Sequence, residues 1–223
     1  MNGRMVKVKD YVLDIFMPNR CPCCGGFLKW YEKLCSSCME SLPLCNEEDA
    51  PPKGCSASVS VFDFDGRAKQ GIYSLKDGQG RAFAGYAARL LAQRLDGCGA
   101  DLITCVPMPY RKKSDRGWNQ AEVIARELAK AMGVDCSSKI LRRKYSRTEQ
   151  HSLTAAGRTG FAGEQYTAAK APPDIRGRRI ILVDDVITTG ATVSVCAAIL
   201  LSLGAADVIA ASVCRTKLGS KEK

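Results

Sequence analysis

The sequence predicts an α/β protein with a mainly parallel sheet, preceded by a small cysteine-rich module. Between residues 55 and 216, short apolar runs of strand length alternate with stretches that have helical apolar spacing. This alternation favours βαβ units, whose consecutive strands run parallel. By contrast, five of the twelve cysteines lie between Cys21 and Cys38. We therefore expect a module at residues 1–50, a main domain at residues 55–216 and a basic tail at residues 217–223.

The overall composition is that of a globular chain, with 46% hydrophobic and 25% charged residues. No apolar run reaches the roughly 18 residues of a membrane-spanning helix. Residues 1–20 combine basic residues with an apolar stretch that Asp14 interrupts, and no small-residue cleavage site follows. We interpret this segment as an amphipathic helix rather than a signal peptide. We expect a cytoplasmic protein whose clustered cysteines bind metal instead of forming disulfides.

Two C-x2-C pairs, separated by ten residues, dominate the cysteine-rich module. Two such knuckles can place four thiolates around one tetrahedral Zn²⁺, which would stabilise a segment too short to build its own core. The single histidine, His151, argues against a histidine-ligated centre. Buried free thiols and an iron–sulfur cluster are the alternatives. The expected ligands of a structural zinc are Cys21, Cys24, Cys35 and Cys38.

The first knuckle offers a choice between Cys23 and Cys24. We favour Cys24 because Gly25 follows it, and glycine tolerates the positive φ at which the knuckle turns its backbone N–H groups towards sulfur. Three cysteines in apolar stretches of the main domain are expected to be buried and unreactive. They are Cys105, Cys196 and Cys214.

A Pro- and acid-rich linker, residues 46–54, leads into the main domain. Residues 57–64 alternate apolar and small side chains around an Asp-Gly pair, which is typical of a strand or hairpin. Residues 81–95 carry apolar side chains at helical spacing. Residues 102–106 then form a short apolar strand that ends at Pro107.

The alternation continues in the second half of the main domain. Residues 119–132 are predicted to form an amphipathic helix that Gly133 terminates. Residues 178–183 are predicted to form a buried strand, and residues 189–203 a helix that again ends at a glycine. Residues 207–214 complete the series as another apolar strand. A mainly parallel sheet accommodates this order of elements.

Positive charge is concentrated in one part of the chain. The sequence contains 33 Lys and Arg against 23 Asp and Glu, which gives a net charge of +10. Within residues 107–150 there are 11 basic and 5 acidic residues, a local excess of +6. Such a field suits an anionic ligand, either a phosphorylated small molecule or nucleic acid.

The strongest motif runs from the buried strand into the next helix, at residues 180–192. It is not a Walker A loop, yet its Thr/Gly segment at a helix N-terminus would offer backbone N–H groups and hydroxyls to a phosphate. Gly190 would allow the backbone to approach the anion closely. Asp184 and Asp185 are expected at the carboxyl end of the strand, where α/β sheets bind ligands. Carboxylates beside an anion site suit ribose hydroxyls and Mg²⁺.

This motif resembles the phosphoribosyl pyrophosphate (PRPP) loop of type I phosphoribosyltransferases. From about residue 12 to residue 215, the chain also resembles the ComF/GntX family of competence-associated, phosphoribosyltransferase-like proteins. The resemblance includes the paired C-x2-C motifs, Val-Pro-Met-Pro at 106–109, Arg-Gly-Trp-Asn-Gln-Ala-Glu at 116–122, and Gln150-x2-Leu153-x4-Arg158. It implies a type I phosphoribosyltransferase fold with an N-terminal zinc ribbon.

The resemblance also implies roles for individual residues. Asp184 and Asp185 would contact ribose hydroxyls of PRPP, which binds together with Mg²⁺. The 5-phosphate would lie on Thr188, Thr189, Gly190, Ala191 and Thr192. The pyrophosphate loop would contain Pro107, Arg111, Lys112 and Lys113. The mobile loop that closes over the substrate would contain Arg147, Gln150 and Arg158.

Two positions depart from the pattern of the resembled proteins. Phe161 stands where the family usually has an asparagine, and Thr188 stands where purine-type members often carry an aspartate that serves the base. A threonine cannot act as that general base, so an acceptor nucleobase is not implied. Turnover, if it occurs, would displace pyrophosphate from the anomeric carbon through an oxocarbenium-like transition state.

The resemblance further implies a role in natural transformation, downstream of DNA uptake. Arg116 and Trp118, in the basic stretch, are candidate contacts for single-stranded DNA, since bases stack on aromatic rings and phosphates bind cations. The zinc module is expected to be structural or to dock competence proteins. A PRPP-sensing regulator and an active phosphoribosyltransferase of unknown acceptor are the alternative functions.

Overall fold

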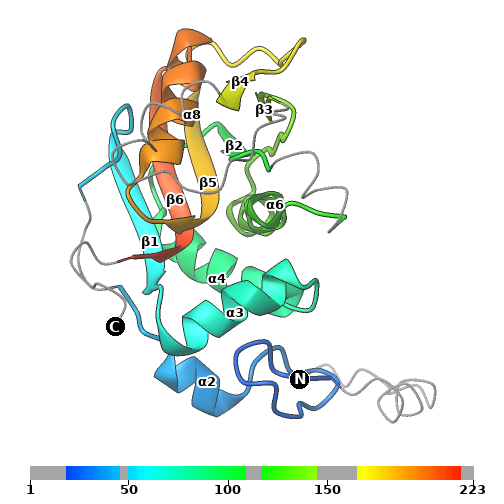
Figure 1. The fold of residues 1–223 in the computed structure, drawn as a ribbon. Helices are drawn as coiled ribbons and strands as arrows, with labels where there is room; N and C mark the ends of the chain where they lie inside the picture. The colour runs from blue at the N-terminus through cyan, green and yellow to red at the C-terminus, as the bar shows by residue number, and fades with distance from the viewer. Residues whose placement is uncertain (1–18, 46–49, 109–116, 145–164, 217–223) are drawn as a thin grey trace.

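The computed structural model describes residues 19–45, 50–108, 117–144 and 165–216 (Figure 1). In this part of the chain, four parallel strands form a sheet in the order β1-β6-β5-β2. This arrangement confirms the predicted α/β class. The strands are β1 (Ala57–Asp63), β2 (Leu102–Cys105), β5 (Arg179–Ile187) and β6 (Asp207–Arg215).

Helices cover both faces of the sheet, because successive side chains of a strand point to opposite sides. In β5, Ile181 and Val183 belong to a core shared with three helices, whereas Ile180 and Leu182 pack in a second core under α8. The three helices are α3 (Gly66–Lys76), α4 (Arg81–Arg94) and α6 (Gln120–Met132), and α8 spans Ala191–Ser202. A small antiparallel pair, β3 (Leu141–Arg143) and β4 (Tyr166–Ala168), lies on the α8 side.

The cysteine-rich module contains the short helix α2 (Ser36–Ser41) and attaches to the edge strand β1. The Cys45 N–H donates to the Val61 carbonyl at 2.8 Å, and Leu44 and Phe62 form an antiparallel bridge. The Arg94 guanidinium donates to the carbonyl of Cys45 at 2.8 Å as well as to that of Ser60. The chain entering the linker therefore covers an edge that would otherwise expose unpaired backbone groups.

Residues 57–64 supply a strand, not a hairpin. The Asp-Gly pair after β1 begins a helix, because the Asp65 side chain accepts a hydrogen bond from the Gly66 N–H as the N-cap of α3. Helix α3 was not predicted from the sequence. Strand β5 is also longer than predicted: it was expected to end at residue 183, but it pairs with β6 as far as Ile187.

The other elements expected within the described residues lie within a few residues of their predicted bounds. The amphipathic helix expected in residues 1–20 and the basic tail expected at residues 217–223 fall in segments that lie outside the described part of the chain, apart from residues 19 and 20. Asn119 caps α6, and Gly133 ends it in the left-handed conformation, at φ 68°. Among the described residues, no helix is both long enough and apolar enough to cross a membrane.

Candidate functional site

The four expected zinc ligands come together in the cysteine-rich module. The Sγ atoms of Cys21, Cys24, Cys35 and Cys38 all lie within 4.8 Å of one another. The Cys24 and Cys35 sulfurs are 3.8 Å apart, and the N–H groups of Gly26 and Cys38 donate to them, each at 3.4 Å. Tetrahedral ligation at about 2.3 Å from zinc requires sulfurs about 3.8 Å apart. The cluster is therefore compatible with a structural metal.

Cys23 lies outside the sulfur cluster and is buried in the core that the module shares with the main domain. Burial raises the pKa of the Cys23 thiol to about 12. At Cys21, burial also raises the pKa, but hydrogen bonds from the backbone of Cys35, Cys23 and Cys24 outweigh it and lower the value to about 7. Gly25 adopts φ 73°, the positive angle expected behind Cys24. Of Cys23 and Cys24, only Cys24 contributes its sulfur to the cluster.

The three cysteines expected in the core are buried there. Burial raises the pKa of Cys196 and of Cys214 above its ordinary value, so both thiols stay protonated near neutral pH. This fits the prediction that they are buried, unreactive thiols.

The two acidic residues of the phosphate-loop motif lie in the last part of β5 and are partly buried. Oδ1 of Asp184 accepts the Asp185 N–H at 2.9 Å, and Oδ1 of Asp185 accepts the Val186 N–H at 2.9 Å. Burial, together with the neighbouring Asp185 charge, raises the pKa of Asp184 well above its usual range. These backbone hydrogen bonds orient both carboxyl groups at the end of the strand.

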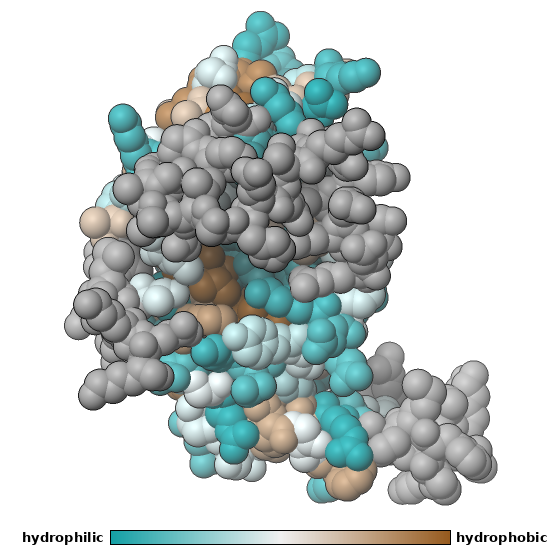
Figure 2. Space-filling model, viewed as in Figure 1, coloured by the Kyte–Doolittle hydropathy of each residue, from teal (hydrophilic) through white to brown (hydrophobic). Residues whose placement is uncertain are grey.

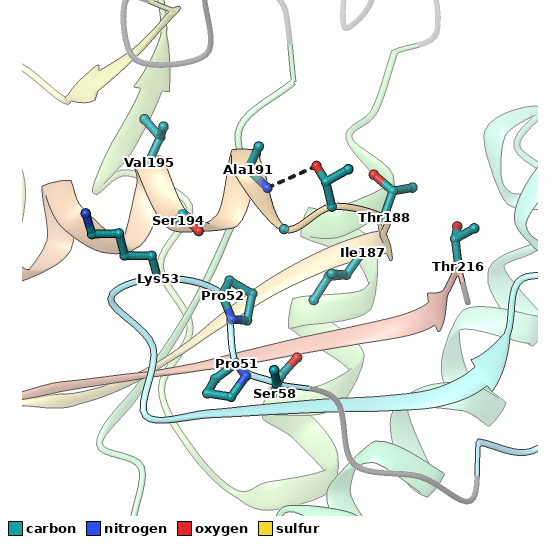
Figure 3. Close-up of a pocket in the computed structure, with 13 residues that line it drawn as sticks. Pro51, Pro52, Lys53, Ser58, Ile187, Thr188, Ala191, Ser194, Val195 and Thr216 are labelled. Atoms are coloured by element: carbon teal, nitrogen blue, oxygen red, sulfur yellow. Dashed lines mark hydrogen bonds between the residues drawn. The ribbon is translucent and has the colours of Figure 1, made fainter. Parts of the chain in front are cut away.

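The loop after β5 exposes Thr188 and Thr189 and then turns into α8. Gly190 makes this turn at φ 72°, and Oγ1 of Thr189 accepts the Ala191 N–H at 3.4 Å (Figure 3). Beside the loop lies a cavity of about 540 Å³, whose other wall is the linker, including Pro52 and Lys53. Loop residues 188–191 line this cavity, which therefore lies next to the N-terminus of α8.

The start of the expected pyrophosphate loop lies at the same edge of the sheet as the acidic pair. Cys105 pairs with Val183, and the Val106 N–H donates to the Val183 carbonyl at 2.9 Å. Pro107 therefore leaves β2 beside the point where Asp184 and Asp185 follow Val183. Other expected site residues lie outside the described part of the chain. These are Arg111, Lys112, Lys113, Arg116, Arg147, Gln150 and Arg158, and Phe161 lies outside it too.

Trp118 lies in a half-buried position between helices. Its Nε1–H donates to the Leu75 carbonyl at 3.2 Å, and its ring lies against Gly78. The next residue, Asn119, donates from Nδ2 to the Val106 carbonyl at 2.9 Å. The Gly-Trp-Asn segment thus connects the end of α3 to the end of β2.

Two residues near this edge were not among the expected site residues. Nζ of Lys76, at the end of α3, lies 3.6 Å from Oδ2 of Asp185. It was missed because α3 itself was not predicted. Gln120 is 2% exposed, and its Nε2 has no hydrogen-bond partner among the described residues. The sequence indicates this position only as part of the 116–122 motif, because a glutamine at a helix start carries no sign of whether it will be buried.

Known proteins with similar sequences include a phosphoribosyltransferase domain family and full-length relatives. The family model for the phosphoribosyl transferase domain matches residues 115–223. The "DNA utilization protein YhgH" of Salmonella typhi is 31% identical over 208 residues, which cover 88% of this chain and 90% of that protein. The chain belongs to the ComF/GntX family. "Competence protein F" of Haemophilus influenzae is 29% identical over 108 residues, 48% of this chain and 47% of that protein.

This ComF/GntX protein accordingly has the α/β fold of the phosphoribosyltransferases, with a four-cysteine cluster in front of it. Among solved structures, glutamine PRPP amidotransferase from B. subtilis is 20% identical, with a TM-score of 0.47. The match covers 65% of this chain and 30% of that one.

Proposed function

We propose that this protein binds PRPP together with Mg²⁺ at the edge formed by the ends of β5 and β2. The observation that carries the proposal is the direct continuation of an acidic pair into a phosphate-binding helix terminus. Asp184 and Asp185 would accept the vicinal ribose hydroxyls, and residues 188–192 would donate N–H and hydroxyl groups to the 5-phosphate. Mg²⁺ would neutralise charge on the diphosphate.

The residues of this site are better suited to binding PRPP than to activating an acceptor nucleobase. Thr188 is exposed at the point where a general base for an acceptor would be needed, and a hydroxyl cannot take that role near neutral pH. Pro107 and the residues after it would receive the diphosphate. A transferase step would need only positioning and charge stabilisation at the anomeric carbon. We therefore infer a PRPP-binding protein and regard an active phosphoribosyltransferase, or a PRPP sensor, as the alternatives.

A titration of the full chain with PRPP, with and without Mg²⁺, tests the proposal. Calorimetric binding that requires Mg²⁺ supports it, and a lack of binding in both conditions contradicts it. A pyrophosphate-release assay, run with and without single-stranded DNA, then distinguishes the alternatives. Release identifies a transferase or hydrolase activity, whereas binding without release identifies a sensor or DNA-handling factor.

We further propose a role in handling single-stranded DNA, as the names of the relatives suggest. Aromatic rings and cations alternate on the exposed face of the cysteine-rich module. Phe27 is 72% exposed with the Arg20 guanidinium 4.3 Å from its ring centre, and Tyr31 is 55% exposed with Lys29 Nζ 5.9 Å from its ring centre. Hydrophobic and hydrophilic residues are interspersed over this lower part of the molecule (Figure 2). Such a surface suits stacked bases and phosphates.

The DNA proposal has two candidate contact regions, which one experiment separates. If bases stack on the module, Phe27→Ala and Tyr31→Ala each weaken binding of an oligothymidine by about 1–3 kcal/mol. If the basic stretch around Arg116 and Trp118 binds instead, Trp118→Ala causes that loss. In either case the affinity falls steeply with salt, because contacted phosphates release counterions. A lack of binding even at low salt would contradict a direct role in DNA binding. A role in DNA handling would then require a competence protein that docks on the cysteine-rich module.

A further inference from the structure

One cation from outside the phosphate-loop motif reaches the acidic pair. Lys76 is the last residue of α3, and its Nζ lies 3.6 Å from Oδ2 of Asp185. The two side chains are 29% and 21% exposed, so water screens their interaction only in part. The Lys76 ammonium also lies over the Tyr73 ring, with Nζ 5.8 Å from the ring centre. The ammonium is therefore directed towards the sheet edge and not into bulk solvent.

The position of Lys76 depends on how α3 ends. The turn after the helix closes tightly, since the N–H groups of Gln79 and Gly80 both donate to the Ser74 carbonyl, at 3.0 and 2.9 Å. Trp118 holds this turn from the other side. Its Nε1–H donates to the Leu75 carbonyl, one residue before Lys76.

The indole ring of Trp118 also fits against the turn. A methyl group on Gly78 would lie 2.4 Å from the ring, so only a glycine leaves room for the indole. Gly78 has φ 86°, which independently favours glycine. The C-terminal end of α3 is thus fixed by the hydrogen bonds of its own turn and by the Trp118 indole. The indole contacts Leu75 and Gly78, on either side of Lys76 in the chain.

We propose that Lys76 is a PRPP-site residue and that Trp118 is a positioning residue that acts through it. The inference rests on the proposed PRPP function. In the free protein the ammonium balances one of two adjacent carboxylates and holds Asp185 in place. When PRPP is bound, the ribose hydroxyls donate to the carboxylates, and the ammonium supplies a positive charge beside a ligand with several negative ones.

The test measures PRPP affinity by calorimetry at fixed Mg²⁺ for three single variants of the full chain. Lys76→Met removes the charge but keeps the stem, and we expect about a tenfold weaker affinity, the usual worth of one charge-assisted contact. Lys76→Arg restores the charge and should stay within about threefold of the unmodified protein. Lys130→Met is the control, because this lysine pairs with Glu127 on the outer face of α6. It should leave PRPP affinity unchanged.

A double-mutant cycle tests the link to the indole. Trp118→Phe keeps a ring but removes the N–H donor, and it should weaken PRPP binding about threefold when Lys76 is present. In the Lys76→Met background the same change should have no further effect, because the two residues act through one contact. Equal effects in both backgrounds would show that Trp118 does not act through Lys76.

The outcomes separate this inference from the function on which it rests. If the unmodified protein binds PRPP and Lys76→Met binds it equally well, the inference is wrong and the proposed function stands. If the unmodified protein does not bind PRPP with Mg²⁺, both are wrong. Thermal unfolding of each variant verifies that a lost affinity reflects the site and not a lost fold.

Discussion

Pro52 of the linker lies directly against Gly190 of the phosphate loop. A methyl group on Gly190 would come within 3.0 Å of Pro52 Cγ and 3.1 Å of its Cβ. The segment that joins the cysteine-rich module to the main domain therefore also forms one wall of the loop proposed to bind the 5-phosphate. A displacement of Pro52 would therefore directly affect the position of Gly190.

Gly190→Ala should both destabilise the protein and weaken its affinity for PRPP. Gly190 has φ 72°, where an L-residue costs about 1–2 kcal/mol, and the added methyl group crowds Pro52. Combining it with Pro52→Ala should recover part of the stability, since that change removes the crowding but not the backbone strain. Urea unfolding and PRPP calorimetry measure the two effects. A Gly190→Ala protein with unchanged stability and affinity would contradict this description of the loop.

The fold class could be predicted because β2, β5 and β6 are short apolar runs, and because α6 has a capping asparagine and a terminating glycine. α3 was missed for a physical reason. Its buried face contains the small residues Ala68 and Gly71 beside Ile72 and Leu75, and the Asp-Gly pair at its start was interpreted as part of a strand or hairpin. Gly71 is needed there, since a methyl group on it would lie 2.7 Å from the Phe83 ring. Small residues on the buried face of α3 allow it to pack closely against α4, but small residues are a poor indication of burial in the sequence.

The phosphate-loop motif and the four-cysteine cluster could be found from the sequence, since both consist of residues close together in the chain. The contact between Lys76 and Asp185 could not, because 109 positions separate them and only the tertiary fold brings them together. Trp118 illustrates the same limit. An aromatic residue among cations suggested base stacking, whereas its N–H group is used by the end of α3.

One zinc ion per chain is expected in the cysteine-rich module. Cys24→Ser should lose zinc because Cys24 contributes a sulfur to the cluster, whereas Cys23→Ser should keep it because Cys23 is buried outside the cluster. Elemental analysis after gel filtration measures the zinc content of both variants. Equal loss in the two variants, or full retention in Cys24→Ser, would show that the cluster is assigned wrongly.

Gly78→Ala should destabilise the protein more than a glycine substitution that has only backbone strain. Gly133→Ala is the matched control, since Gly133 has φ 68°, also ends a helix, and has no neighbour within 4 Å of the added methyl group. The control should cost about 1–2 kcal/mol. Gly78→Ala should cost at least about 1 kcal/mol more, because the methyl group collides with Trp118. Equal losses in urea unfolding would mean that the indole does not pack on Gly78.

Asp184→Asn should raise the melting temperature of the ligand-free protein at neutral pH. Burial and the Asp185 charge raise the pKa of Asp184, so the folded state binds its proton more tightly than the unfolded state. Ionisation therefore costs stability at every pH above the ordinary aspartate value, about 4. The gain from Asp184→Asn should shrink as the pH falls towards that value.

The control for this pH dependence is Asp96→Asn, which alters an exposed carboxylate just beyond α4. Its melting temperature should follow that of the unmodified protein at each pH. An Asp184→Asn variant that is less stable at pH 7 and unchanged at pH 4 would reverse the expected sign and refute the raised pKa.

The double variant Asp184→Asn with Asp185→Asn, titrated calorimetrically with PRPP and Mg²⁺, gives the clearest evidence for or against the proposed site. Both side chains would still accept their backbone N–H groups, so the strand should stay intact, which thermal unfolding can verify. Each lost charge-assisted hydrogen bond is worth about 1.5–3 kcal/mol, so binding should weaken at least a hundredfold. A folded double variant that binds PRPP as tightly as the unmodified protein would contradict the phosphoribosyl site altogether.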